Sequence, residues 1–96
     1  MFSRSRVARL RFLTEAEGGW PRPVTSGIRP MLGIGGQRTS CIVTSVDGDL
    51  VISAGVDVDV VIQIMWPEHN GREFAELRVA ELFDGNTLMA IGTFLP

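Results

Sequence analysis

The chain has 96 residues, of which 45% are hydrophobic, and a formal net charge of −2. This length suits a single domain, and no apolar run approaches the roughly 20 residues of a membrane-spanning helix. A single cysteine, Cys41, excludes an internal disulfide, and the N-terminal stretch lacks the continuous apolar region of a signal peptide, so we expect a cytoplasmic protein without membrane contact.

Charge is distributed unevenly along the chain, which contains no lysine. Residues 1–38 hold seven arginines against two glutamates, whereas residues 39–96 hold two arginines against nine acidic residues. Two arrangements account for this asymmetry. Either basic and acidic strands lie side by side in one small sheet and pair their charges, or a basic patch meets an acidic partner or nucleic acid.

Alternating apolar and polar residues predict β-strands along most of the chain. The first predicted strand is 7–13, where Ala8, Leu10 and Phe12 alternate with arginines. A loop follows over residues 14–27, because three glycines and two prolines in this stretch exclude a regular element. Loops of this length inside compact domains are commonly functional. Further short strands are predicted at 28–35, 39–46 and 50–52.

The longest predicted strand is 56–66, and we expect the domain to be organised around it. Its even positions are apolar from Val56 to Trp66, whereas Asp57 and Asp59 stand at odd positions. Successive side chains of a strand point to opposite faces. We therefore expect Trp66 in the core and both aspartates toward solvent.

The remainder of the chain completes an all-β pattern. Residues 67–72 are predicted to form a loop, and strands follow at 74–83 and 87–95, joined by a tight hairpin. No segment shows a helical pattern. Short strands at this spacing are typical of a sandwich or a small closed barrel, and a barrel leaves no exposed edge for aggregation. We expect a flexible N-terminus over residues 1–6 and a single domain over 7–96.

Three segments carry a resemblance to a known family. Leu13-Thr14-Glu15-Ala16-Glu17-Gly18-Gly19, Pro23 and Gly27-Ile28-Arg29-Pro30 resemble the signature of the C-terminal β-barrel domain of elongation factor Tu. Residues 52–58 are similar to that family's turn into a long strand, and residues 83–92 to its last hairpin. The resemblance implies a six-stranded antiparallel closed β-barrel and a free-standing copy of that domain.

The chain also departs from the family at positions that carry function there. Trp20 and Pro21 stand where the family has an arginine and a histidine that contact the T-stem of aminoacyl-tRNA. Ile28 replaces a tyrosine, and Met31 replaces a polar residue. No Gly-rich phosphate loop occurs, so we expect no bound nucleotide. The family's RNA contacts and GTPase docking are therefore not expected of this chain.

The loop after the first strand holds the candidate site residues. Trp20 is followed after Pro21 by Arg22, and Trp and Arg are enriched at interface hot spots. These two residues and Arg29 are candidates for partner binding. The alternative for Trp20 is that it folds back and closes one end of the barrel, and for Arg29 that it makes a structural ion pair or binds loop carbonyls. Loop-shaping positive-φ turns are predicted at Gly18, Gly19 and Gly27.

Residues for catalysis or metal binding are scarce. The one histidine, His69, falls in a predicted surface loop, and no second histidine or cysteine stands at ligand spacing. A nucleophile–base pair would have to combine His69 with Cys41, and neither lies in a motif. We therefore predict no catalytic residue, no metal and no cofactor.

Three hypotheses about function follow from these observations. The first is a non-catalytic protein-binding module, and one version is a decoy or immunity protein that mimics the translation factor's surface. The second is binding of tRNA or other RNA through the arginines of residues 1–38, against which the missing lysines and the replaced contact residues count. The third is a subunit of a split or homo-oligomeric translation-factor-like assembly. We favour the first.

Overall fold

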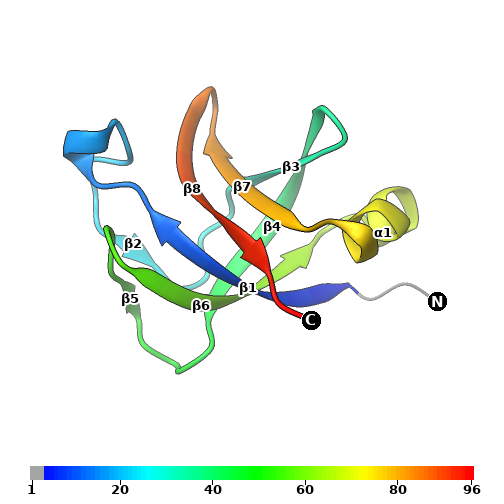
Figure 1. Ribbon diagram of the computed structural model, residues 1–96, viewed down its shortest axis with the longest axis horizontal. Helices are drawn as coiled ribbons and strands as arrows, with labels where there is room; N and C mark the ends of the chain where they lie inside the picture. Colours follow the sequence, from blue (N-terminus) through cyan, green and yellow to red (C-terminus); the bar gives the residue numbers. More distant parts are fainter. Residues whose placement is uncertain (1–3) are drawn as a thin grey trace.

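The computed structural model describes residues 4–96, which form a closed barrel of six antiparallel strands (Figure 1). The all-β class and the six-stranded barrel are thus confirmed. The strands follow each other around the barrel in the order β1-β6-β4-β3-β7-β8, and β8 pairs with β1 to close it. The barrel strands are β1 (Ser5–Phe12), β3 (Met31–Ile34), β4 (Gln37–Ser45), β6 (Asp57–Ile64), β7 (Val79–Asp84) and β8 (Thr87–Phe94).

The ends of the predicted strands shift by a few residues. β1 begins at Ser5, inside the stretch expected to be a flexible N-terminus, and residues 1–3 of that stretch lie outside the described part of the chain. A two-stranded ribbon of β2 (Val24–Thr25) and β5 (Val51–Ile52) stands apart from the barrel sheet. β2 arises within the stretch predicted to be an irregular loop.

The central strand β6 pairs with β1 on one side and with β4 on the other. Its inward side chains Val60, Ile62 and Ile64 are fully buried, whereas Asp57 and Asp59 lie on the outer face. The predicted alternation is therefore confirmed over this part of the strand. The core is completed by inward residues of the other strands, among them Ala8, Leu10, Phe12, Leu32, Val43, Ala80 and Leu82.

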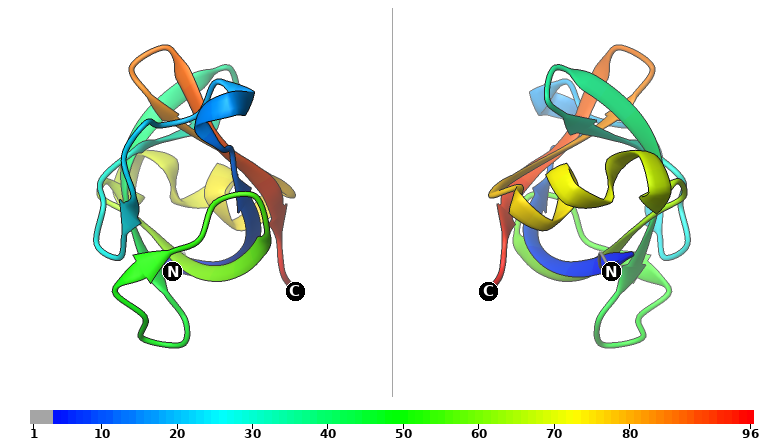
Figure 2. Two further views of the ribbon diagram at one scale, coloured as in Figure 1. Left: turned by 90° about the vertical axis from the view of Figure 1, so that its left-hand side faces the viewer. Right: turned by 90° about the vertical axis from the view of Figure 1, so that its right-hand side faces the viewer.

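A ten-residue helix, α1 (Pro67–Glu76), lies across one end of the barrel, as the right-hand view of Figure 2 shows. The prediction of a loop at 67–72 and a strand from 74 was wrong, since β7 begins only at Val79. Pro67 takes the first helical position, where its missing N–H is not needed, and Glu68 in the first turn suits the helix dipole. Phe74 is the fully buried aromatic residue of this helix.

Trp66 was expected in the core but is 54% exposed. β6 ends at Ile64, and Trp66 occupies the N-cap position of α1, with φ −126° and ψ 65°. The chain has left the strand at this point, so the alternation of faces no longer applies to it. The aromatic ring that fills this end of the barrel comes instead from Phe74.

Candidate functional site

The loop that holds the candidate residues begins with a short 3-10 helix, η1 (Glu15–Glu17). The carboxylate of Glu17 accepts hydrogen bonds from the Thr14 amide at 3.0 Å and the Thr14 hydroxyl at 3.1 Å, and it pairs with Arg11 at 2.8 Å. The bond from Arg11, helped by the Thr14 amide, lowers the pKa of Glu17 to about 2. This capping box and ion pair fix the loop to β1.

The three glycines predicted to shape the loop do so in two ways. Gly18 and Gly27 have φ of +87° and +95°, which favours glycine over other residues. The prediction of a positive φ at Gly19 was wrong, since its φ lies outside this region. A Cβ at Gly19 would collide with the backbone carbonyl of Leu13, so close approach rather than backbone conformation explains glycine there.

Trp20 is half-buried and packs against the core cluster. Its indole Nε1 donates a hydrogen bond to Asp84 Oδ2 at 2.6 Å, at the end of β7. This placement is the alternative in which the ring folds back onto the barrel. A cavity of about 60 Å³ remains beside it, which has room for only a few water molecules. Its walls are Trp20, Ile28, Arg29, Pro30, Asp84 and Met89.

The two candidate arginines of this region differ in position. Arg29 shares the small cavity with Trp20, whereas Arg22 does not line it. Both side chains are exposed. Within residues 4–96, Arg29 makes neither the ion pair nor the carbonyl bonds expected of it. The structure therefore brings Trp20 and Arg29 together and leaves Arg22 at the surface.

Cys41 and His69, the two residues considered for nucleophilic chemistry, are in unlike environments. Cys41 is buried on β4, and burial raises the pKa of its thiol to about 12, so it stays protonated near neutral pH. His69 is exposed on α1. In the described range 4–96, no three acidic, histidine or cysteine side chains are grouped to hold a metal ion. The one α-helix described here is too short to cross a bilayer.

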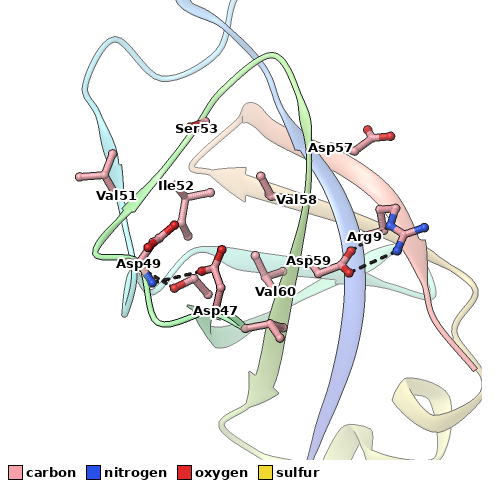
Figure 3. A pocket seen from close by; sticks show the side chains of 12 residues that line it. Arg9, Asp47, Asp49, Val51, Ile52, Ser53, Asp57, Val58, Asp59 and Val60 are labelled. Atoms are coloured by element: carbon pink, nitrogen blue, oxygen red, sulfur yellow. Dashed lines mark hydrogen bonds and ion pairs between the residues drawn. The ribbon is translucent and has the colours of Figure 1, made fainter.

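A larger hollow lies elsewhere, between β5 and the first half of β6 (Figure 3). We call it the β5–β6 groove. Its volume is about 450 Å³, inside the roughly 300–1,000 Å³ range of ligand pockets. Ile52 and Val58 extend into the space between the two strands, while Asp57 points away from it to the outer face. The lining residues are Arg9, Ser45, Val46, Asp47, Asp49, Val51, Ile52, Ser53, Asp57, Val58, Asp59 and Val60.

The groove has an apolar surround and an acidic rim. Among the described residues, the carboxylates of Asp47, Asp49 and Asp57 have no arginine within ion-pair distance. Asp59 is different, because Arg9 Nε and Nη2 donate to its two oxygens at 2.9 and 3.2 Å. Four large apolar side chains of the adjoining segment, Val46, Leu50, Val51 and Val56, are each more than half exposed.

Sequence reasoning missed this groove. The turn at Asp47-Gly48-Asp49 and the short apolar strand after it were visible, but they suggested an ordinary hairpin into the long strand. The pattern gave no sign that β5 would pair with β2 from the distant loop. Comparison of the sequence with protein-family models gives no match, and no curated protein matches it either.

Proposed function

We propose that this chain is a non-catalytic protein-binding module. One observation carries the proposal: Val46, Leu50, Val51 and Val56 present exposed apolar surface beside the β5–β6 groove. Contiguous exposed apolar patches rimmed by polar groups mark interaction sites on monomeric proteins. Leu50 is 79% exposed, and leaving such a side chain in water gains nothing for the fold itself.

The resemblance to the elongation factor Tu barrel supports a narrower version of this proposal. A free-standing barrel with that surface would act as a decoy or immunity-type protein, occupying a protein that otherwise binds the translation factor. The replaced residues Trp20 and Pro21 fit such a role, since a decoy has no need of the tRNA contact. The closed six-stranded barrel is compatible with this version.

The arginines favour protein over RNA as the partner. RNA binding draws its affinity from cations that are free to meet phosphates. Four of the seven arginines of residues 1–38 already donate to carboxylates or backbone carbonyls of this same chain. These are Arg6, Arg9, Arg11 and Arg38.

The test is capture of partners from native cell lysate on the immobilised chain, followed by titration calorimetry with each protein retained. We compare wild type with a groove variant, Leu50→Ser with Val51→Ser, and with a loop variant, Trp20→Ala with Arg22→Ala. Val79→Ser with Ile91→Ser is the matched control, since these are exposed apolar residues of β7 and β8. Circular dichroism confirms that each variant is folded.

We expect to capture a protein that binds wild type and the control variant with equal affinity. Its affinity for the groove variant should be at least tenfold lower. A partner lost only with the loop variant would move the binding surface to Trp20 and Arg22. Retention of tRNA, with affinity falling steeply with salt, would support the RNA hypothesis instead. If nothing binds wild type more tightly than the groove and loop variants, the proposal fails.

A further inference from the structure

β5 and β6 follow each other in the chain yet do not pair. β5 pairs with β2, whereas β6 pairs with β1 and β4. Only residues 53–56 connect the two strands, which is the length of an ordinary hairpin loop. The β5–β6 groove therefore occupies the place where two consecutive antiparallel strands would normally share hydrogen bonds.

Hydrogen bonds at the C-terminal end of β6 show which of its backbone groups face the groove. The Ile64 amide donates to the Arg4 carbonyl at 2.9 Å on the β1 side, and the Met65 amide to the Ser40 carbonyl at 3.1 Å on the β4 side. Backbone groups alternate in direction along a strand. The backbone N–H and C=O groups of even-numbered residues in β6 thus point toward β1. Those of odd-numbered residues point toward β4 or, where β4 has ended, into the groove.

β4 ends before β6 does. Its last paired residue, Ser45, lies opposite Val60, and one more bond joins the Val46 amide to the Asp59 carbonyl at 3.3 Å. From there toward the start of β6 no strand of the described chain adjoins this edge. The N–H and C=O of Asp57 therefore point into the groove without a ladder partner.

The opposite wall is an open edge as well. The Ser26 amide donates to the Leu50 carbonyl at 2.8 Å, so the even residues of β5 face β2. By alternation, the backbone groups of Val51 and Ser53 face away from β2, and both residues line the groove. An extended chain in the groove would meet unpaired donors and acceptors from both strands.

The side chains around the groove indicate which residue types an added strand should contain. Ile52 and Val60 on the inner side are buried, and Val58 beside them is half-buried, so inward side chains of an added strand would enter apolar surroundings. On the outer face the carboxylates of Asp49 and Asp57 have no arginine of the described chain within ion-pair distance, although Arg9 and Arg11 of β1 attract the charge of Asp57 from the other edge. An added strand should therefore alternate apolar and basic residues.

β1 provides an internal precedent on the other edge of β6. There Ala8 and Leu10 point into the core, while Arg9 stands opposite Asp59 and Arg11 opposite Asp57. Arg9 forms a two-bond ion pair with its opposite residue. β6 already accepts one strand of alternating arginine and apolar residues on this edge. For a strand on its second edge, the outer-face carboxylate of β6 without a direct ion pair in the described chain is that of Asp57, since Arg9 already binds both oxygens of Asp59.

We propose that the β5–β6 groove binds an extended segment of a partner protein, in which arginine or lysine alternates with apolar residues, as a strand added to the free edge of β6. This inference rests on the proposed protein-binding function and names the chemistry of the partner. Strand addition of this kind takes affinity from main-chain hydrogen bonds and specificity from alternate side chains.

The test titrates the full-length, ¹⁵N-labelled chain with a blocked hexapeptide of alternating arginine and valine, followed by amide chemical shifts. Three comparison peptides replace arginine by glutamate, replace valine by serine, or methylate the backbone nitrogens of alternate residues. The protein variant is Asp49→Asn with Asp57→Asn. Glu73→Gln with Glu81→Gln is the control of equal charge, since both glutamates are exposed on other elements.

We expect saturable shifts at residues 51–53 and 57–59 with the arginine–valine peptide, and none with the glutamate or methylated peptides. The aspartate variant should bind about threefold to tenfold more weakly, as for two exposed ion pairs, while the control binds like wild type. Equal affinity in both variants, equal binding of the methylated peptide, or no binding at millimolar concentration would overturn the proposal. Shifts of these amides on raising protein concentration alone would show a second copy as the occupant and also overturn it.

Failure of this proposal is distinguishable from failure of the proposed function. If lysate capture yields a partner that depends on Leu50 and Val51 while the peptide does not bind, the module binds proteins by another chemistry. If neither experiment gives binding at the groove, both proposals fail together.

Discussion

The three arginines of β1 stabilise the molecule in three different ways. Arg9 pairs with Asp59 across the strands, and Arg11 pairs with Glu17 of η1. Arg6 donates to the carbonyls of Phe74 and Leu77 at 2.6 and 2.7 Å. These carbonyls belong to the C-terminal end of α1, where a cation is favoured by the helix dipole. The arginines of β1 therefore link this strand to β6, to η1 and to the C-terminal end of α1.

Replacing Arg6 by methionine should lower the free energy of unfolding by about 2 kcal/mol, because two helix-end carbonyls lose a charged donor. The guanidinium also lies 4.4 Å from the ring centroid of Phe94, so its removal loosens packing at this end. Urea unfolding at pH 7 measures the change. Arg78→Met, at an exposed arginine, is the control and should change stability by less than about 0.5 kcal/mol. Equal losses in both variants would contradict the role assigned to Arg6.

The lowered pKa of Glu17 predicts that the stability of the fold depends on pH. Its pKa is lowered from an ordinary value of 4.5 to about 2 in the folded chain, chiefly by Arg11. The unfolded chain therefore binds a proton more readily, so the contribution of this carboxylate is present above about pH 4.5 and is lost between there and pH 2. Glu17→Gln should flatten the fall of the urea midpoint across this range, whereas Glu15→Gln should not. A fall in the Glu17→Gln variant as steep as in wild type would contradict this account.

At the scale of elements, α1 is the clearest case of what the sequence could and could not predict. Pro67 followed by Glu68 is a start signal for a helix, and Gly71, Phe74 and Leu77 recur at spacings of three. The signal was available but weak, because Gly71 disfavours a helix and the β-rich context suggested another strand. In the fold, Gly71 and Phe74 are the buried residues of the helix, so both belong to its inward-facing side.

Phe74 should be the largest single contributor of α1 to stability. Its ring is fully buried and meets Phe94 edge to face, with 5.5 Å between ring centroids. Phe74→Ala should lower the free energy of unfolding by about 3–5 kcal/mol, as for other buried phenylalanines. Phe74→Leu, which keeps most of the volume, should cost less than about 1.5 kcal/mol. Urea unfolding followed by tryptophan fluorescence measures both. A loss below 1 kcal/mol for the alanine variant would show that α1 does not seal the barrel.

At the scale of the whole molecule, local alternation predicted the all-β class but left a sandwich and a small closed barrel open, and the resemblance to the elongation factor Tu barrel implied the closed six-stranded barrel that the structure has. Strands such as β1 and β6 carry a strict inside–outside pattern, and closing the sheet is the way to bury every inward row. The candidate site was harder to predict, because the residue type of Trp20 suggested a contact residue but did not show in which direction its side chain points. Its bond to Asp84 joins residues 64 positions apart, which no local pattern encodes.

The β5–β6 groove lies furthest from what the sequence predicts. It exists because β5 pairs with β2, a strand of two residues within the glycine-proline loop. That choice of partner depends on the path of the whole loop, which Glu17, Gly18 and Gly19 direct back over the barrel. A property of the assembled molecule thus creates the open edge of β6, and the proposed partner binding depends on it.

Hydrogen exchange of individual backbone amides in the free, full-length chain tests that open edge most directly. The Val58 amide faces β1 opposite Leu10 and should be protected, whereas the Asp57 amide faces the groove and should exchange at least tenfold faster than Val58 after correction for intrinsic rates. Addition of the arginine–valine hexapeptide should raise the protection of Asp57 toward that of Val58. Protection of Asp57 equal to that of Val58 in the free chain would mean that the edge is already paired, and would contradict the account.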